Sequence, residues 1–93
     1  MALLDKARTA LRISTVAYDE EIQDLIDSAK LDLGIAGVVL PEELDALVSR
    51  AIITYCKMHF GDVSPDQFRL LSASYDSQKG QLQIATGYTD WSS

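Results

Sequence analysis

The chain contains few side chains suited to catalysis or metal binding. Cys56 and His59 are three residues apart in a segment with helical periodicity, the spacing of a nucleophile and its base or of two metal ligands. Asp62 could join them, although an aspartate beside Gly61 is common turn chemistry. One cysteine and one histidine complete neither an internal disulfide nor a usual zinc set. We therefore interpret Cys56 as a small buried apolar residue.

Paired carboxylates are the second candidate for chemistry. Glu20 with Asp24, and Glu42 with Glu43, have the residue types of a glycosidase acid and base. Such catalysis requires carboxyl groups that converge on a cleft and differ in pKa, whereas these occupy helix starts or a solvated helix face. The sequence also contains no glycine-rich phosphate loop, nucleophile elbow or HExxH motif. We expect no enzymatic activity, no catalytic residue, no metal and no cofactor.

The elements that must position these residues are helical. Apolar residues recur at intervals of three and four in four segments: 2–12, 19–33, 41–60 and 64–80. Prolines open the third and fourth segments, glycines follow the second and third, and Gly80 ends the fourth.

After these helices, Gln81 to Thr86 alternate polar and apolar residues, with Leu82 and Ile84 on one side, which predicts a short strand. We predict an all-α fold, a small bundle of about four helices with a short C-terminal extended or β segment. Residues 1–86 form the domain and residues 87–93 a C-terminal tail.

Composition is that of one small globular domain. The 93 residues are 47% hydrophobic and 24% charged, with a net charge of -6. The longest run of apolar residues and glycine, 35–40, is far shorter than the roughly 20 residues that span a bilayer, and no secretory signal follows Met1. We expect a cytoplasmic protein without a membrane partner. Its acidity also disfavours specific binding of nucleic acid, which requires a basic patch.

Charge is divided unevenly along the chain. Residues 1–17 hold three cations and one anion, whereas residues 18–45 hold nine anions and one cation. A basic first helix and an acidic second helix are suited to contact between neighbouring copies. The second half of the third helix adds a further apolar stripe, which indicates burial on two sides, by its own domain and by a neighbour.

Two large aromatic residues, Tyr88 and Trp91, stand in the polar tail. They either fold back as a lid over the helices or anchor a partner, because tyrosine and tryptophan are enriched at binding hot spots. The segment with Leu82 and Ile84 could likewise pair with a strand of another chain, since a lone strand leaves its backbone unpaired.

The order of motifs resembles the small head-tail connector proteins, also called head completion or adaptor proteins, of tailed bacteriophages and prophages. The resemblance covers most of the chain and rests on these motifs: Leu11-Arg12-Ile13, Asp19-Glu20-Glu21-Ile22 with Leu25-Ile26 and Ala29, Leu40-Pro41-Glu42-Glu43-Leu44, Tyr55-Cys56-Lys57-Met58-His59-Phe60-Gly61, Phe68, Ser74-Tyr75, Gln81-Leu82-Gln83 and Thr86-Gly87-Tyr88-Thr89.

The resemblance implies a structural virion protein without chemistry. Such subunits form a ring, twelvefold in the family, beneath the portal of the filled capsid. The implied partners are further copies of the chain, the portal protein, and a tail or head-completion protein. DNA passes through the ring without specific binding. The implied location is the head-tail junction of the virion, after a stay in the host cytoplasm.

These considerations give an expected set of contact residues. The expected subunit interface comprises Arg8, Arg12, Glu20, Asp24, Asp27, Ile53, Cys56 and Phe60. The expected partner-docking residues are Leu82, Ile84, Tyr88 and Trp91. The acidic face could instead line the DNA channel, and we favour the subunit contact. An alternative of another class is a small acidic helical binding module that inhibits or adapts a host protein through residues 18–45.

Overall fold

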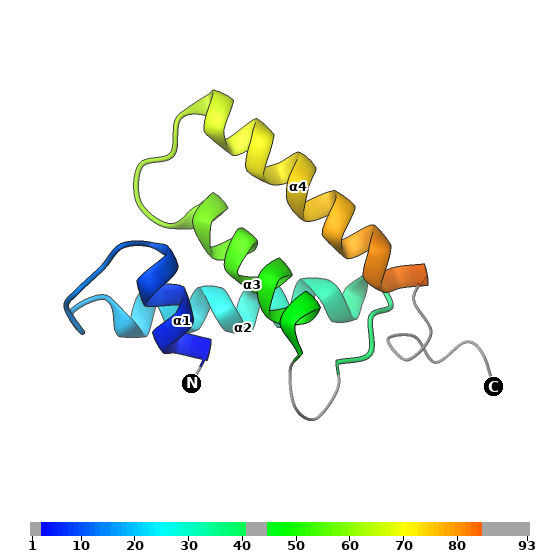
Figure 1. The fold of residues 1–93 in the computed structure, drawn as a ribbon, viewed down its shortest axis with the longest axis horizontal. Coiled ribbons are helices and arrows are strands. Elements are labelled where there is room, and N and C mark those ends of the chain that lie inside the picture. Colours follow the sequence, from blue (N-terminus) through cyan, green and yellow to red (C-terminus); the bar gives the residue numbers. More distant parts are fainter. Residues whose placement is uncertain (1–2, 41–44, 85–93) are drawn as a thin grey trace.

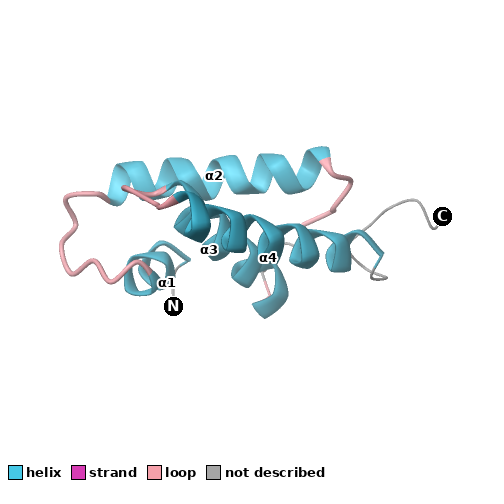
Figure 2. Ribbon diagram, turned by 90° about the horizontal axis from the view of Figure 1, so that it is seen from above, coloured by secondary structure: helices cyan, strands magenta, loops and turns pink. Residues whose placement is uncertain are grey.

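The structure is a computed structural model that describes residues 3–40 and 45–84. Within these residues the chain forms four helices and no strand: α1 (Leu3–Ala10), α2 (Asp19–Ile35), α3 (Ala46–His59) and α4 (Pro65–Ile84). Figure 1 shows α3 crossing α2, with α1 and α4 on either side of α3. In the view from above, α2 forms one side of the molecule and the other three helices form the opposite side (Figure 2). The prediction of an all-α bundle is confirmed.

α2 follows the predicted pattern closely. Its apolar stripe is fully buried and consists of Ile22, Ile26, Ala29 and Leu33. Three acidic residues stand in its first turn, where they complement the helix dipole. The helix ends in a Schellman motif, in which the Val38 N–H donates to Leu33 O at 2.9 Å and Gly37 takes a left-handed φ of 91°.

α3 is capped by a side chain that the sequence prediction assigned to the helix interior. Asp45 has an extended backbone, and its carboxylate accepts from the Val48 N–H at 3.0 Å. The helix therefore begins at Ala46 rather than at Pro41, because an aspartate at this position satisfies the free N–H groups of the first turn. The other end agrees with prediction, since Phe60 is extended and Gly61 is left-handed with φ 69°.

α4 begins as predicted and ends later. The Ser64 hydroxyl accepts from the Gln67 N–H at 3.1 Å, as in a capped first turn. The helix then continues past Gly80 to Ile84, so the strand predicted from Gln81 is wrong as far as Ile84. The physical reason is that Leu82 lies two helical turns after Tyr75, and helix continuation buries both in one core. Ala85 and Thr86 lie outside the described residues.

α1 is shorter than the predicted segment 2–12. It stops at Ala10, and Arg12 takes a left-handed φ of 60°. The Ile13 N–H donates to Arg8 O and the Arg12 N–H to Thr9 O, both at 3.0 Å. This is again a Schellman motif, with an arginine at the position that glycine usually occupies.

Polar contacts join α4 to α2 at the far end of the bundle. The Tyr75 hydroxyl donates to Asp32 Oδ2 at 2.6 Å, and Lys79 Nζ lies 3.3 Å from the same oxygen. Gln83 Nε2 donates to Ala36 O at 2.9 Å. The bond from Tyr75, followed by the contact with Lys79, lowers the pKa of Asp32. Burial, and then the bond to Asp32, raises the pKa of Tyr75.

The burial pattern of α2 gives a matched pair of variants. Leu33 is 0% exposed and Leu31 is 69% exposed, two residues apart on the same helix. Leu33→Ala should lower the free energy of unfolding by about 2–5 kcal/mol through lost apolar contact and a cavity. Leu31→Ala should change it by less than about 0.5 kcal/mol. Urea midpoints of the dilute proteins measure both, and equal effects would contradict the core assignment.

The lowered pKa of Asp32 predicts a contribution to stability that depends on pH. The contribution is present above the unfolded value, about 4, and is lost as the pH falls through the folded value. Asp32→Asn should therefore cost about 1 kcal/mol at pH 7 and flatten the loss of stability below pH 4. Asp66→Asn, at a carboxylate that is 87% exposed, is the control. Parallel acid-unfolding curves for Asp32→Asn and the unmodified chain would refute the pH-dependent contribution of Asp32 to stability.

Candidate subunit-contact surfaces

The outer face of α2 carries one continuous stripe of exposed residues. Its first half is acidic and contains Glu20, Asp24 and Asp27. Its second half is apolar, with Leu31 at 69% and Ile35 at 86% exposure. We call these five residues the α2 stripe. Their spacing of three and four keeps them on one helix face, opposite the buried stripe. The acidic half was predicted from the sequence, whereas the apolar half was missed.

Two adjoining grooves lie among α1, α3 and α4. The first has a volume of about 470 Å³ and is lined by residues that include Lys6, Arg50 and Lys57. The second, of about 450 Å³, includes Arg12 and Leu70, and the two grooves share Lys57 and Leu71. Among the described residues, no acidic side chain lines either groove. We call the pair the basic groove.

The basic groove faces away from α2. On α3, Arg50, Ile53 and Lys57 line it, whereas Val48 and Ile52 are buried in the core on the opposite side of the same helix. Figure 2 shows α2 alone on its side of the molecule. The α2 stripe and the basic groove thus lie on opposite sides.

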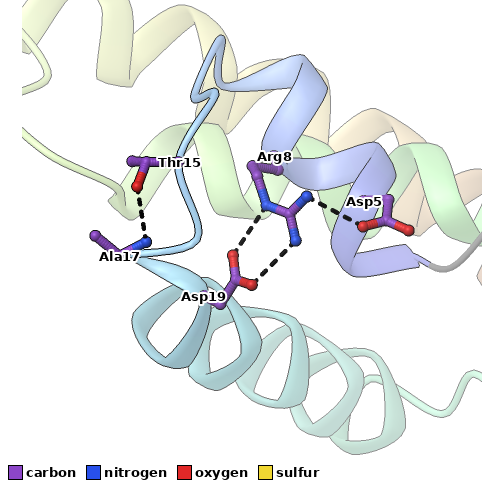
Figure 3. A network of polar contacts seen from close by, with 5 residues as sticks. All are labelled: Asp5, Arg8, Thr15, Ala17 and Asp19. Carbon is purple, nitrogen blue, oxygen red and sulfur yellow. Dashed lines mark hydrogen bonds and ion pairs between the residues drawn. The ribbon is translucent and has the colours of Figure 1, made fainter.

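Arg8, expected at a subunit interface, makes a bidentate contact within the chain. Its Nε lies 2.9 Å from Asp19 Oδ1 and its Nη2 lies 3.0 Å from Asp19 Oδ2. A third contact of 3.1 Å joins Nη1 to Asp5, as Figure 3 shows. The bond to Asp19 raises the pKa of Arg8. Nearby, the Ala17 N–H donates to the Thr15 hydroxyl in the loop between the helices. Arg8 thereby joins α1 to the start of α2.

Two other residues of the expected contact set lie in the core. Cys56 is 0% and Leu82 is 1% exposed, so neither presents a surface to a neighbour in this structure. The physical reason is that each lies on the helix face that packs inward, with apolar partners from the other helices. Ile53 and Phe60 are partly buried, and Ile84 is exposed. Tyr88 and Trp91 lie outside the described residues.

The residues considered for catalysis do not form one site. Burial raises the pKa of the Cys56 thiol to about 11, which disfavours the reactive thiolate. His59 is exposed and packs its ring against Tyr55 and Phe68, at centroid distances of 4.5 and 5.9 Å. Glu20 and Asp24 lie on the exposed outer face of α2, and Glu42 and Glu43 lie outside the described residues.

Comparison with known proteins assigns the chain to a family. The model of a family described as phage connector protein matches residues 3–89, which include all four helices. The chain belongs to this family. No curated protein and no solved structure matches it. The phage connector is a structural component of the virion and associates with other head and tail proteins. In the described part of this connector, no helix is long and apolar enough to cross a membrane.

The raised pKa of Cys56 predicts a thiol that does not react in the folded connector. At pH 8 a thiol of pKa about 11 is roughly one part in a thousand thiolate, and its core position further excludes reagents. A colourimetric thiol probe should react slowly with the native protein and at once in denaturant. Rapid modification of the native protein would restore Cys56 as a candidate nucleophile.

Proposed function

We propose that this connector protein is a subunit of the ring between the phage portal and the tail. In this role the ring extends the DNA channel and docks the next head-completion or tail protein. The family supports a structural role, and the fold supplies a small helical subunit. Twelvefold symmetry is the expectation that the connector family brings.

The observation that carries the proposal is the charge difference between opposite sides of the subunit. The α2 stripe is acidic and apolar, whereas the basic groove is cationic and apolar. Surfaces that differ and lie on opposite sides favour heterologous contacts, in which each copy meets the next in the same way. Such contacts form a ring when the rotation between neighbours closes.

Other contacts of the ring are assigned to the C-terminal end of the chain. Ile84 is exposed at the end of α4, which suits the docking of a portal or tail protein there, together with Tyr88 and Trp91. DNA passes through the ring without specific binding. Any acidic residues that remain exposed after assembly would favour its free passage.

Light scattering coupled to size exclusion, with negative-stain imaging, tests the proposal. We expect rings with an open centre as the protein concentration rises. Asp24→Lys with Asp27→Lys should abolish them, because charge reversal removes the attraction between neighbours and adds repulsion. Asp66→Lys with Asp76→Lys is the matched control, since both positions are exposed on α4 and the net charge is the same.

The experiment that could refute the proposal must also include the portal. Imaging the protein mixed with portal-bearing capsids covers the case in which assembly requires the portal. A chain that neither forms rings nor binds these capsids would refute the proposal. A single stoichiometric host partner recovered instead, in a salt-sensitive complex, would support the binding-module alternative.

A further inference from the structure

We propose that the α2 stripe of one copy docks into the basic groove of the next copy. The inference rests on the proposed ring and specifies which two surfaces form it. The stripe comprises Glu20, Asp24, Asp27, Leu31 and Ile35, and the groove is lined by α1, α3 and α4.

The distribution of cations points to the groove as the receiving surface. The chain has eight lysines and arginines. Three of them, Arg8, Arg69 and Lys79, form ion pairs within the subunit. Four others line the groove, and none of the four has an ion-pair partner among the described residues: Lys6, Arg12, Arg50 and Lys57. In a protein of net charge -6, this is where an acidic surface finds complementary charge.

The acidic half of the stripe is equally unengaged. Glu20 and Asp24 make no ion pair within residues 3–40 and 45–84, and Asp27 accepts only a bond of 3.0 Å from Gln23. Three carboxylates on one helix face therefore meet four cations in one groove. In the part of the chain that the structure describes, the match leaves no like-charged pair across the contact, because none of the lining residues is acidic.

The apolar halves of the two surfaces also correspond. Leu31 and Ile35 continue the stripe beyond Asp27, and the second groove presents Leu70 at 67% exposure beside Leu71. The stripe from Glu20 to Ile35 is about 22 Å long at 1.5 Å per residue. An amphipathic helix laid in a groove buries such anchors at intervals of three and four. The acidic half then lies over Arg50 and Lys57, and the apolar half over Leu70.

The backbone at Arg12 supports the same assignment. Arg12 is held at φ 60°, a left-handed backbone conformation that is strained for a residue other than glycine. Glycine would end α1 without this strain. Backbone strain of this kind clusters at functional sites, and here it places a guanidinium in the wall of the second groove.

Site-directed cross-linking tests the contact between full-length copies. Asp24→Cys in one copy and Arg50→Cys in another are mixed with a short bis-maleimide, and we expect the buried Cys56 thiol to remain unreactive in both, which the unmodified chain controls for. We expect the mixed product to exceed, by roughly tenfold or more, that of Asp24→Cys with Asp66→Cys. Asp66 is also exposed but lies outside the groove lining.

Charge exchange provides a second, independent readout. Asp24→Lys with Asp27→Lys, or Arg50→Glu with Lys57→Glu, should each weaken self-association roughly tenfold or more. All four substitutions in one chain restore opposite charges across the contact and should recover most of the association. Mixing the two double variants should do the same. Failure of both combinations to recover would overturn the inference.

The outcomes separate this inference from the proposed function. Rings without the mixed cross-link would overturn the stripe-and-groove contact and leave the ring intact. Intact rings in groove variants that no longer retain DNA would assign the groove to DNA instead. A chain that neither self-associates nor cross-links, alone or on portal-bearing capsids, would overturn both.

Discussion

The burial of α3 on most of its circumference determines the arrangement of the other helices. α3 packs against α1, α2 and α4, and its residues Val48, Ala51, Ile52 and Cys56 have no exposed surface. A small domain has a small hydrophobic core, and here the central helix supplies much of it. The remaining helices must then lie around α3. α2 consequently lies on one side of the molecule, with the other three helices opposite it (Figure 2).

Two polar contacts fix the outer helices on this core. Arg8 joins α1 to the start of α2 through Asp19, and Asp32 receives Tyr75 from α4 near the other end of α2. Bidentate arginine–carboxylate pairs and charge-assisted hydrogen bonds are directional, so they fix the relative orientation of the helices more closely than apolar packing does. The same two carboxylates also form ion pairs with Arg8 and Lys79 within the subunit. The cations left for an external partner are consequently concentrated in the basic groove.

The fold was largely predictable from local patterns, and the contact surfaces only in part. The α2 core stripe and the Ser64 cap are signals within one helix, and both were predicted correctly. The strand predicted over residues 81–86 was wrong as far as Ile84, because so short an alternation also fits a helix when Leu82 can share a face with Tyr75. The basic groove could not be predicted, since its cations come from α1, the residues just after it and α3, which only the tertiary structure brings together. For the same reason, the role of Arg8 within the subunit was missed.

The division of charge also explains why a closed assembly suits this subunit. Two copies of net charge -6 repel each other. At physiological salt the Debye length is about 8 Å, so this repulsion is largely screened at greater distances. In the contact that we propose, complementary charges would fix the register, and the apolar halves would add affinity that salt does not screen. An open chain of copies would leave one stripe with Leu31 and Ile35 exposed at one end and an empty groove at the other. In the proposed assembly, closure of the ring would cover both surfaces, which would favour a ring over a fibre wherever the rotation between copies permits.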